Sequence, residues 1–191
     1  PDRPPVGTDR DGVDAAGALA DAVLGLAADA VGQGRVGEAR RLLAVADRFG
    51  DNGWRARVRL GWVTAEVALA SGRPQDAVPV AETAVRGARS ARARRHVTKS
   101  EALLATTLVN MTTERDRERA IRLLEGIVPR SLERGMLPLV WPSALLLADV
   151  TPGAADRWRD LGQSALSCVL SRTDGDGVAL AAASPWTPAS S

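Results

Sequence analysis

Four small residues recur at a constant interval of 38 positions in the first half of the chain. The first set is Ala27, Gly34, Ala39 and Ala46, and the second set is Ala65, Gly72, Ala77 and Ala84. Small side chains at fixed positions let two antiparallel helices approach closely, and glycine accepts the positive φ at which many helices end. Because both sets share one spacing, the sequence predicts two similar helical hairpins stacked in an array.

The composition favours helices over strands along the rest of the chain. Of the 191 residues, 34 are Ala, the best helix former, whereas Phe49 is the only Phe and Tyr is absent. Turn residues interrupt the apolar helical periodicity repeatedly, which predicts about eight helices. Their expected ranges are 13–32, 36–49, 54–71, 74–89, 91–111, 115–134, 137–150 and 153–171.

The two ends of the chain differ in composition from this helical middle. Residues 1–12 hold three Pro, several charges and few apolar side chains, and are expected to be disordered. Residues 172–191 are interpreted as a flexible C-terminal tail. Within them, the segment from Asp174 to Gly177 begins like a calcium-binding loop but lacks the closing Glu that such a loop needs. The expected helical repeat domain therefore spans 13–171.

The pattern of small residues resembles the tetratricopeptide repeat (TPR) family, whose unit is a helical hairpin of about 34 residues. The resemblance covers about 75 residues and implies an all-α, right-handed superhelix of about four antiparallel helix pairs. Ala occupies most positions where the family carries aromatic residues, and in the third pair Ala105 and Ala120 lie 15 positions apart rather than 12. In its longer interval the chain is more similar to the degenerate helical repeats in regulatory domains of bacterial transcription factors. An Ala-rich bundle with coincidental spacing is the alternative fold.

The charge is concentrated in one segment, although the formal net charge of the whole chain is only +2. Residues 53–99 hold ten basic residues against three acidic ones. The resemblance implies that the first helix of each pair lines a concave groove. The residues assigned to that groove are Arg55, Arg59, Trp62 and Glu66 in the second pair, Arg95 and Lys99 in the third, and Trp141 in the fourth. Such a groove suits an acidic or C-terminal segment of a partner protein. The alternative is a solvated Arg-rich face with Trp62 buried inside the repeat.

Two other functions compete with this adaptor or regulatory interpretation. A basic patch formed by Arg86, Arg89, Arg92, Arg94 and His96 could contact nucleic acid or another polyanion, although no recognition motif is visible. The chain could also be the sensor domain of a bacterial transcriptional regulator. We expect a protein or peptide partner, favour an acidic one over nucleic acid, and leave homo-oligomerisation open.

Catalytic signals are weak throughout the chain. With one histidine, His96, and one cysteine, Cys168, the sequence excludes mechanisms or metal sites that need two of either residue. Arg94, Arg95 and Lys99 surround His96 in sequence and should disfavour its protonation, while Cys168 lies on an apolar stripe and should be buried. We therefore expect no enzymatic activity and no cofactor. The absence of a long apolar stretch and of a leader favours a cytoplasmic protein without membrane contact.

Overall fold

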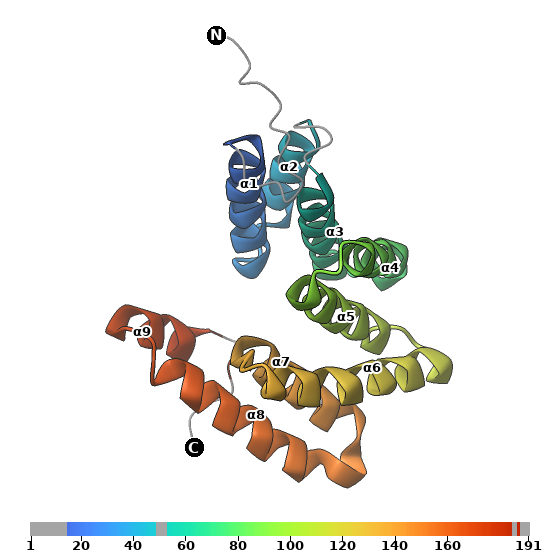
Figure 1. The fold of residues 1–191 in the computed structure, drawn as a ribbon, viewed down its shortest axis with the longest axis vertical. Coiled ribbons are helices and arrows are strands. Elements are labelled where there is room, and N and C mark those ends of the chain that lie inside the picture. Colours follow the sequence, from blue (N-terminus) through green and yellow to red (C-terminus); the bar gives the residue numbers. More distant parts are fainter. Residues whose placement is uncertain (1–14, 49–52, 185–186, 188–191) are drawn as a thin grey trace. The chain divides into compact units, whose positions relative to one another are not determined.

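The computed structural model describes residues 15–48, 53–184 and 187, and all regular secondary structure in these ranges is helical (Figure 1). Its elements are α1 (Ala15–Gly32), α2 (Val36–Asp47), α3 (Gly53–Ala70), α4 (Pro74–Ser90), α5 (Arg94–Val109), α6 (Glu114–Glu133), α7 (Leu137–Val150), the 3-10 helix η1 (Pro152–Ala154), α8 (Ala155–Leu170) and α9 (Gly175–Ala183). The expected disordered segment 1–12 lies outside the described residues. Within those residues, no helix has the length and apolarity needed to cross a lipid bilayer.

All eight helices expected from the sequence are present, with bounds that differ by a few residues. The ninth, α9, was not predicted, because its first residues were interpreted as part of a flexible tail. The Asp174 side chain accepts a hydrogen bond of 2.8 Å from the backbone N–H of Gly177 and so caps the N-terminus of α9. This cap and the Ala-rich sequence that follows compensate for the two glycines in the first turn.

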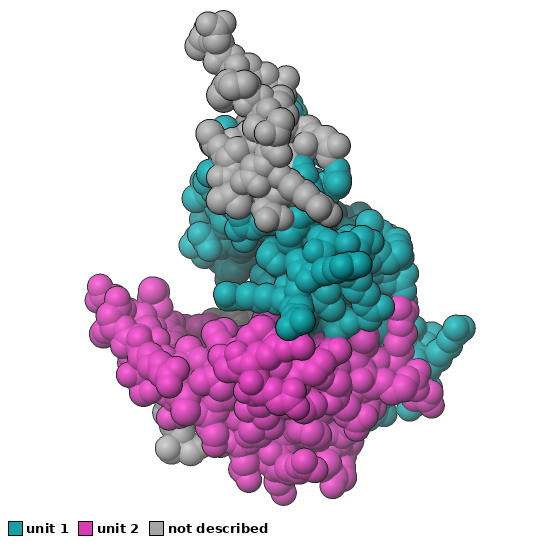
Figure 2. All heavy atoms as spheres, viewed as in Figure 1, with its two compact units in different colours: residues 1–117 teal, residues 118–191 magenta. Residues whose placement is uncertain are grey.

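The chain divides into two compact units, residues 1–117 and 118–191 (Figure 2). The boundary falls in the first turn of α6, so most of that helix belongs to the second unit. Each unit has its own packed interior.

The first unit is built from neighbouring helices that pack in sequence order. Helix α1 packs on α2 and α3, α3 on α4 and α5, and α4 on α5. The first helices of the expected pairs, α1, α3 and α5, are therefore also in contact with one another in succession. This sequential packing is consistent with antiparallel helix pairs.

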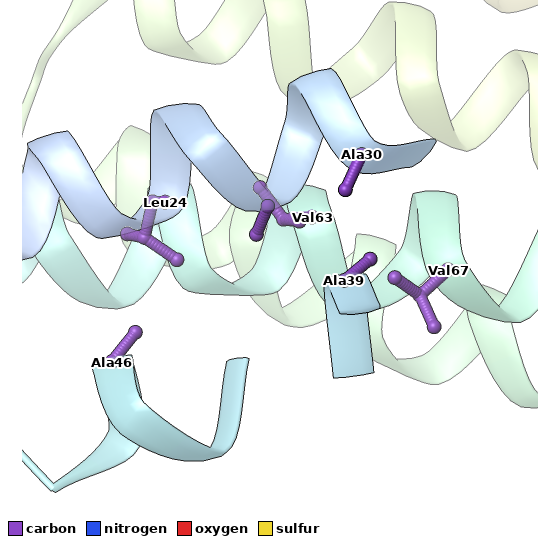
Figure 3. Close-up of a cluster of buried hydrophobic side chains, with 7 residues drawn as sticks. Leu24, Ala30, Ala39, Ala46, Val63 and Val67 are labelled. Carbon is purple, nitrogen blue, oxygen red and sulfur yellow. The ribbon is translucent and has the colours of Figure 1, made fainter. Parts of the chain in front are cut away.

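The repeated small residues occupy the helix interfaces, as predicted. Five of the six repeated alanines are at most 3% exposed, and Ala46 is 7% exposed. Ala39 and Ala46 of α2 meet Leu24 of α1 and Val63 and Val67 of α3 in one core cluster (Figure 3). Here the small side chains allow close helix contact, and the larger aliphatic residues fill the remaining space.

Four interhelical turns share one hydrogen-bond pattern, in which a residue with positive φ and the residue after it donate their N–H groups to carbonyls in the last turn of the helix. Gly34, Gly72 and Gly135 adopt φ values of +72°, +69° and +64°, as expected from their positions. At the α4–α5 turn the same position is held by Arg92, with φ +53°. The N–H of Arg92 bonds to the Arg89 carbonyl, and the N–H of Ala93 to the Ala88 carbonyl, which repeats the pattern at the glycine turns.

The second unit packs α7 against α8, with η1 between them in the chain. Its core cluster combines Val128 of α6, Val140 and Ala144 of α7, and Ala165 of α8. Close approach of α7 and α8 depends on Gly162. A Cβ atom at this position would lie 2.9 Å from Leu145 Cδ2 and 3.2 Å from the backbone oxygen of Trp141.

We expect substitution by Ala to change the free energy of unfolding in opposite directions at Gly162 and Gly126. Gly162→Ala should lower the free energy of unfolding by about 1 kcal/mol, because overpacking outweighs the gain in helix propensity. Gly126→Ala in α6 should raise it by about 1 kcal/mol, since nothing lies closer than 3.9 Å to the added Cβ. Urea unfolding followed by circular dichroism measures both, and equal effects at the two sites would contradict this account of the α7–α8 contact.

Candidate functional site

The stripe of α3 that was assigned to a groove lies between α1 and α5. Arg55 Nη2 pairs with Asp21 Oδ2 of α1 at 2.8 Å, and Arg59 Nε pairs with Asp21 Oδ1 at 2.7 Å. Their side chains are only 20–29% exposed, so one carboxylate is held between two half-buried guanidinium groups. We use the name cationic cluster for Asp21, Arg55, Arg59, Trp62, Glu66, Arg95, His96 and Lys99.

Trp62 links α3 to α5 through three contacts. Its Nε1 donates a hydrogen bond of 2.8 Å to the Oγ of Ser100. The His96 ring stacks on the indole with centroids 5.3 Å apart, and the Lys99 ammonium lies 4.4 Å from the indole centroid. Because Trp62 is only 6% exposed, it acts mainly as a packing residue at the α3–α5 contact. This is the alternative placement considered for it in the sequence.

Two of these contacts join residues that lie one repeat interval apart. Asp21 and Arg59 are separated by 38 positions, and so are Trp62 and Ser100. Asp21 and Ser100 were missed as site residues, although superposing the repeats places each opposite its partner. The interval that predicted the helices therefore also relates the polar contacts between them.

His96 is enclosed by aromatic rings and cations. The Trp54 ring meets it edge-on at 5.0 Å, while Trp62 stacks on it. Burial lowers the pKa of His96, and the charges of Arg55, Arg59 and Arg95 lower it further, against an opposing contribution from Asp21. The predicted direction is confirmed, but two of the responsible arginines come from α3 rather than from the neighbouring sequence.

The pKa of His96 predicts a loss of stability on acidification. Since the neutral ring is favoured in the folded protein, this contribution is fully present above the unfolded pKa of about 6.5. It is lost as the pH falls through the lower folded pKa, with a slope of at most about 1.4 kcal/mol per pH unit. Urea unfolding should show that the free energy of unfolding falls more between about pH 7.5 and about pH 5.5 for wild type than for His96→Phe.

Comparing the stability loss of wild type with that of His96→Phe isolates the contribution of His96. Glu66 is present in both proteins, and its raised pKa makes stability rise on acidification in each of them. Identical pH dependences for wild type and His96→Phe would show that the ring is not held in its neutral form.

Glu66 and Lys99 are both partly desolvated, although the Lys99 side chain still reaches the surface. Burial raises the pKa of Glu66, while Lys99 opposes that rise. Burial also lowers the pKa of Lys99, which Glu66 opposes and Arg59 and Arg95 reinforce. The cluster carries excess positive charge, because it contains four cations and two carboxylates. The cations are Arg55, Arg59, Arg95 and Lys99, and the carboxylates are Asp21 and Glu66. A carboxylate from another molecule would relieve this repulsion.

The remaining predicted site residues are distributed over other surfaces. Arg86, Arg89, Arg92 and Arg94 of the basic patch are exposed. Arg89 pairs with the buried carboxylate of Glu101 at 2.6 Å, and Arg86 donates to Thr83 Oγ1 at 2.8 Å.

Trp141 of the second unit is half-buried and packs on the core cluster of that unit. Cys168 was predicted to be buried but is exposed. The buried face of α8 is formed by Ala155, Gly162, Ala165 and Leu166. At 3.6 residues per turn, Cys168 lies about 120° around the helix from the centre of that face.

No family model, curated protein or solved structure matches this chain. Among the described residues, no group of three or more His, Cys, Asp or Glu side chains could hold a metal ion.

Proposed function

We propose that this protein is a non-catalytic interaction module whose cationic cluster binds an acidic segment of a partner protein. The observation that carries the proposal is the excess positive charge held at the contacts of α1, α3 and α5. The pairing of Arg55 and Arg59 with Asp21 illustrates the chemistry, since the same fork of guanidinium groups suits a carboxylate from a partner. Helices α1, α3 and α5 contact one another in succession, which supports a TPR-like stack. We propose that this stack forms a right-handed superhelix.

The exposed cations Arg95 and Lys99 are the groups that a partner would contact first. Asp21 already occupies Arg55 and Arg59, whereas Lys99 lies against the Trp62 ring and beside two arginines that lower its pKa. Near an apolar ring an ion pair is less screened than in bulk water, so each carboxylate bound here contributes more than at an open surface. Trp62 supports the site by fixing α3 against α5 rather than by contacting the partner.

The test uses a fluorescein-labelled peptide of Asp and Glu residues and measures its binding by fluorescence anisotropy at low salt. The double variant Arg95→Glu/Lys99→Glu should weaken binding at least about tenfold, with unchanged helical content. The matched control, Arg86→Glu/Arg94→Glu, reverses two exposed charges of the basic patch and should bind within about twofold of wild type.

The same pair of variants discriminates against the polyanion alternative. Tighter binding to heparin or to random DNA than to the peptide, lost in Arg86→Glu/Arg94→Glu but kept in Arg95→Glu/Lys99→Glu, would replace the proposal. Arg59 is unsuitable for charge reversal, because its side chain is only 29% exposed and pairs with Asp21. A Glu at that position would face Asp21 and destabilise the α1–α3 contact.

A further inference from the structure

A groove of about 980 Å³ runs between α3 and α4 in the first unit. Val58 and Val80 contribute apolar side chains, and Gly61 and Gly87 contribute none. The glycines are needed for the close packing that shapes it, since a Cβ at Gly61 would lie 3.3 Å from Ala84 Cβ, and one at Gly87 would lie 3.1 Å from Val58 Cγ2. Trp54 also lines the groove. Its volume falls at the upper end of the range that is typical of small-molecule sites.

Charged and hydroxyl groups are found toward the α4–α5 end of this groove. Arg92 lines it together with Ser90, and Arg57 of α3 is a further cation in the lining. The lining thus combines apolar and polar groups in similar measure, which suits an amphipathic ligand. Because the charged groups are arginines, the polar part of such a ligand should be an anion, and a planar carboxylate fits guanidinium geometry best.

The backbone of Arg92 gives an independent reason to assign a role to its side chain. Three turns with the same hydrogen-bond pattern carry Gly34, Gly72 and Gly135 at the residue with positive φ. The fourth carries Arg92 at φ +53°, in the left-handed region that favours glycine. Strained residues of this kind are enriched at ligand-binding sites, and here the Arg92 side chain lines the groove.

We propose that the α3–α4 groove binds an amphipathic carboxylate, such as a medium-chain fatty acid. The apolar chain lies along Val58 and Val80 beside Trp54, and the carboxylate pairs with the Arg92 guanidinium. The site differs from the cationic cluster, so this proposal does not depend on the acidic-peptide function.

Isothermal titration calorimetry with dodecanoate below its micellar concentration tests the proposal on the full chain. Wild type should bind dodecanoate, and dodecyltrimethylammonium should bind at least about tenfold more weakly because its headgroup is a cation. Arg92→Gly should weaken dodecanoate binding at least about tenfold while raising the melting temperature by about 2 °C, since glycine relieves the strained turn. Loss of binding in a more stable protein cannot come from unfolding.

A second comparison changes charge alone. Thr83 is exposed and lines the groove, so Thr83→Glu should repel dodecanoate and Thr83→Gln should not. Arg94→Gln removes an exposed charge two residues from Arg92 and should leave the affinity unchanged. No binding to wild type, equal binding of the anionic and cationic detergents, or wild-type affinity in Arg92→Gly would each overturn the proposal.

Discussion

Trp62→Ala is expected to lower the free energy of unfolding by about 3–5 kcal/mol. The substitution removes the nearly buried indole between α3 and α5, its hydrogen bond to Ser100 and its contacts with His96 and Lys99. A cavity would remain at the junction of the two helices, and the Ser100 hydroxyl would lose its partner. Urea unfolding followed by circular dichroism measures the loss.

The matched control separates the ring from its hydrogen bond. Trp62→Phe keeps an aromatic ring and should cost about 1–2 kcal/mol, and Ser100→Ala should cost about 1 kcal/mol. Because both variants break the same bond, the double variant should cost less than their sum. A loss below about 1 kcal/mol for Trp62→Ala would show that α3 and α5 do not depend on this contact.

Asp21→Asn is expected to change stability and binding in opposite directions. The substitution removes the carboxylate charge shared by Arg55 and Arg59, so we expect a loss of about 2 kcal/mol, between the values typical of exposed and buried ion pairs. It also frees two guanidinium groups for an acidic partner. The affinity for the labelled acidic peptide should therefore rise about tenfold.

Asp76→Asn provides the comparison for an exposed ion pair. Asp76 pairs with Arg73 three residues away, and both side chains are 50% exposed. Its loss should cost at most about 0.5 kcal/mol and leave peptide affinity unchanged. If Asp21→Asn weakened peptide binding, Arg55 and Arg59 would not be competing for a carboxylate.

Local signals in the sequence account for most of the fold. The repeated small residues predicted the tight helix contacts, and Gly34, Gly72 and Gly135 marked turns correctly because only glycine adopts their positive φ without strain. Residues 91–93 were assigned to a helix, since no turn residue marks them in the sequence. Arg92 nevertheless takes a positive φ there, and α5 begins at Arg94.

The candidate site was predicted less completely than the fold. The side chains that gather where α3 meets its neighbours include Arg55, Arg59, Trp62, Arg95 and Lys99, but their spacing does not indicate how deeply Trp62 is buried. Helical periodicity places residues on a face and does not say which partner covers that face. For the same reason Cys168 was assigned to the buried face of α8 although it lies beside that face.

An acidic segment of another protein is proposed to bind at the cationic cluster. An amide NMR titration of the isotope-labelled protein with the acidic peptide locates the bound peptide residue by residue. We expect progressive shifts at Asp21 in α1, along 55–66 in α3 and along 95–100 in α5, with little change in α7 and α8. Shifts confined to 86–94, or shifts in the second unit alone, would show that the peptide does not bind at the cationic cluster.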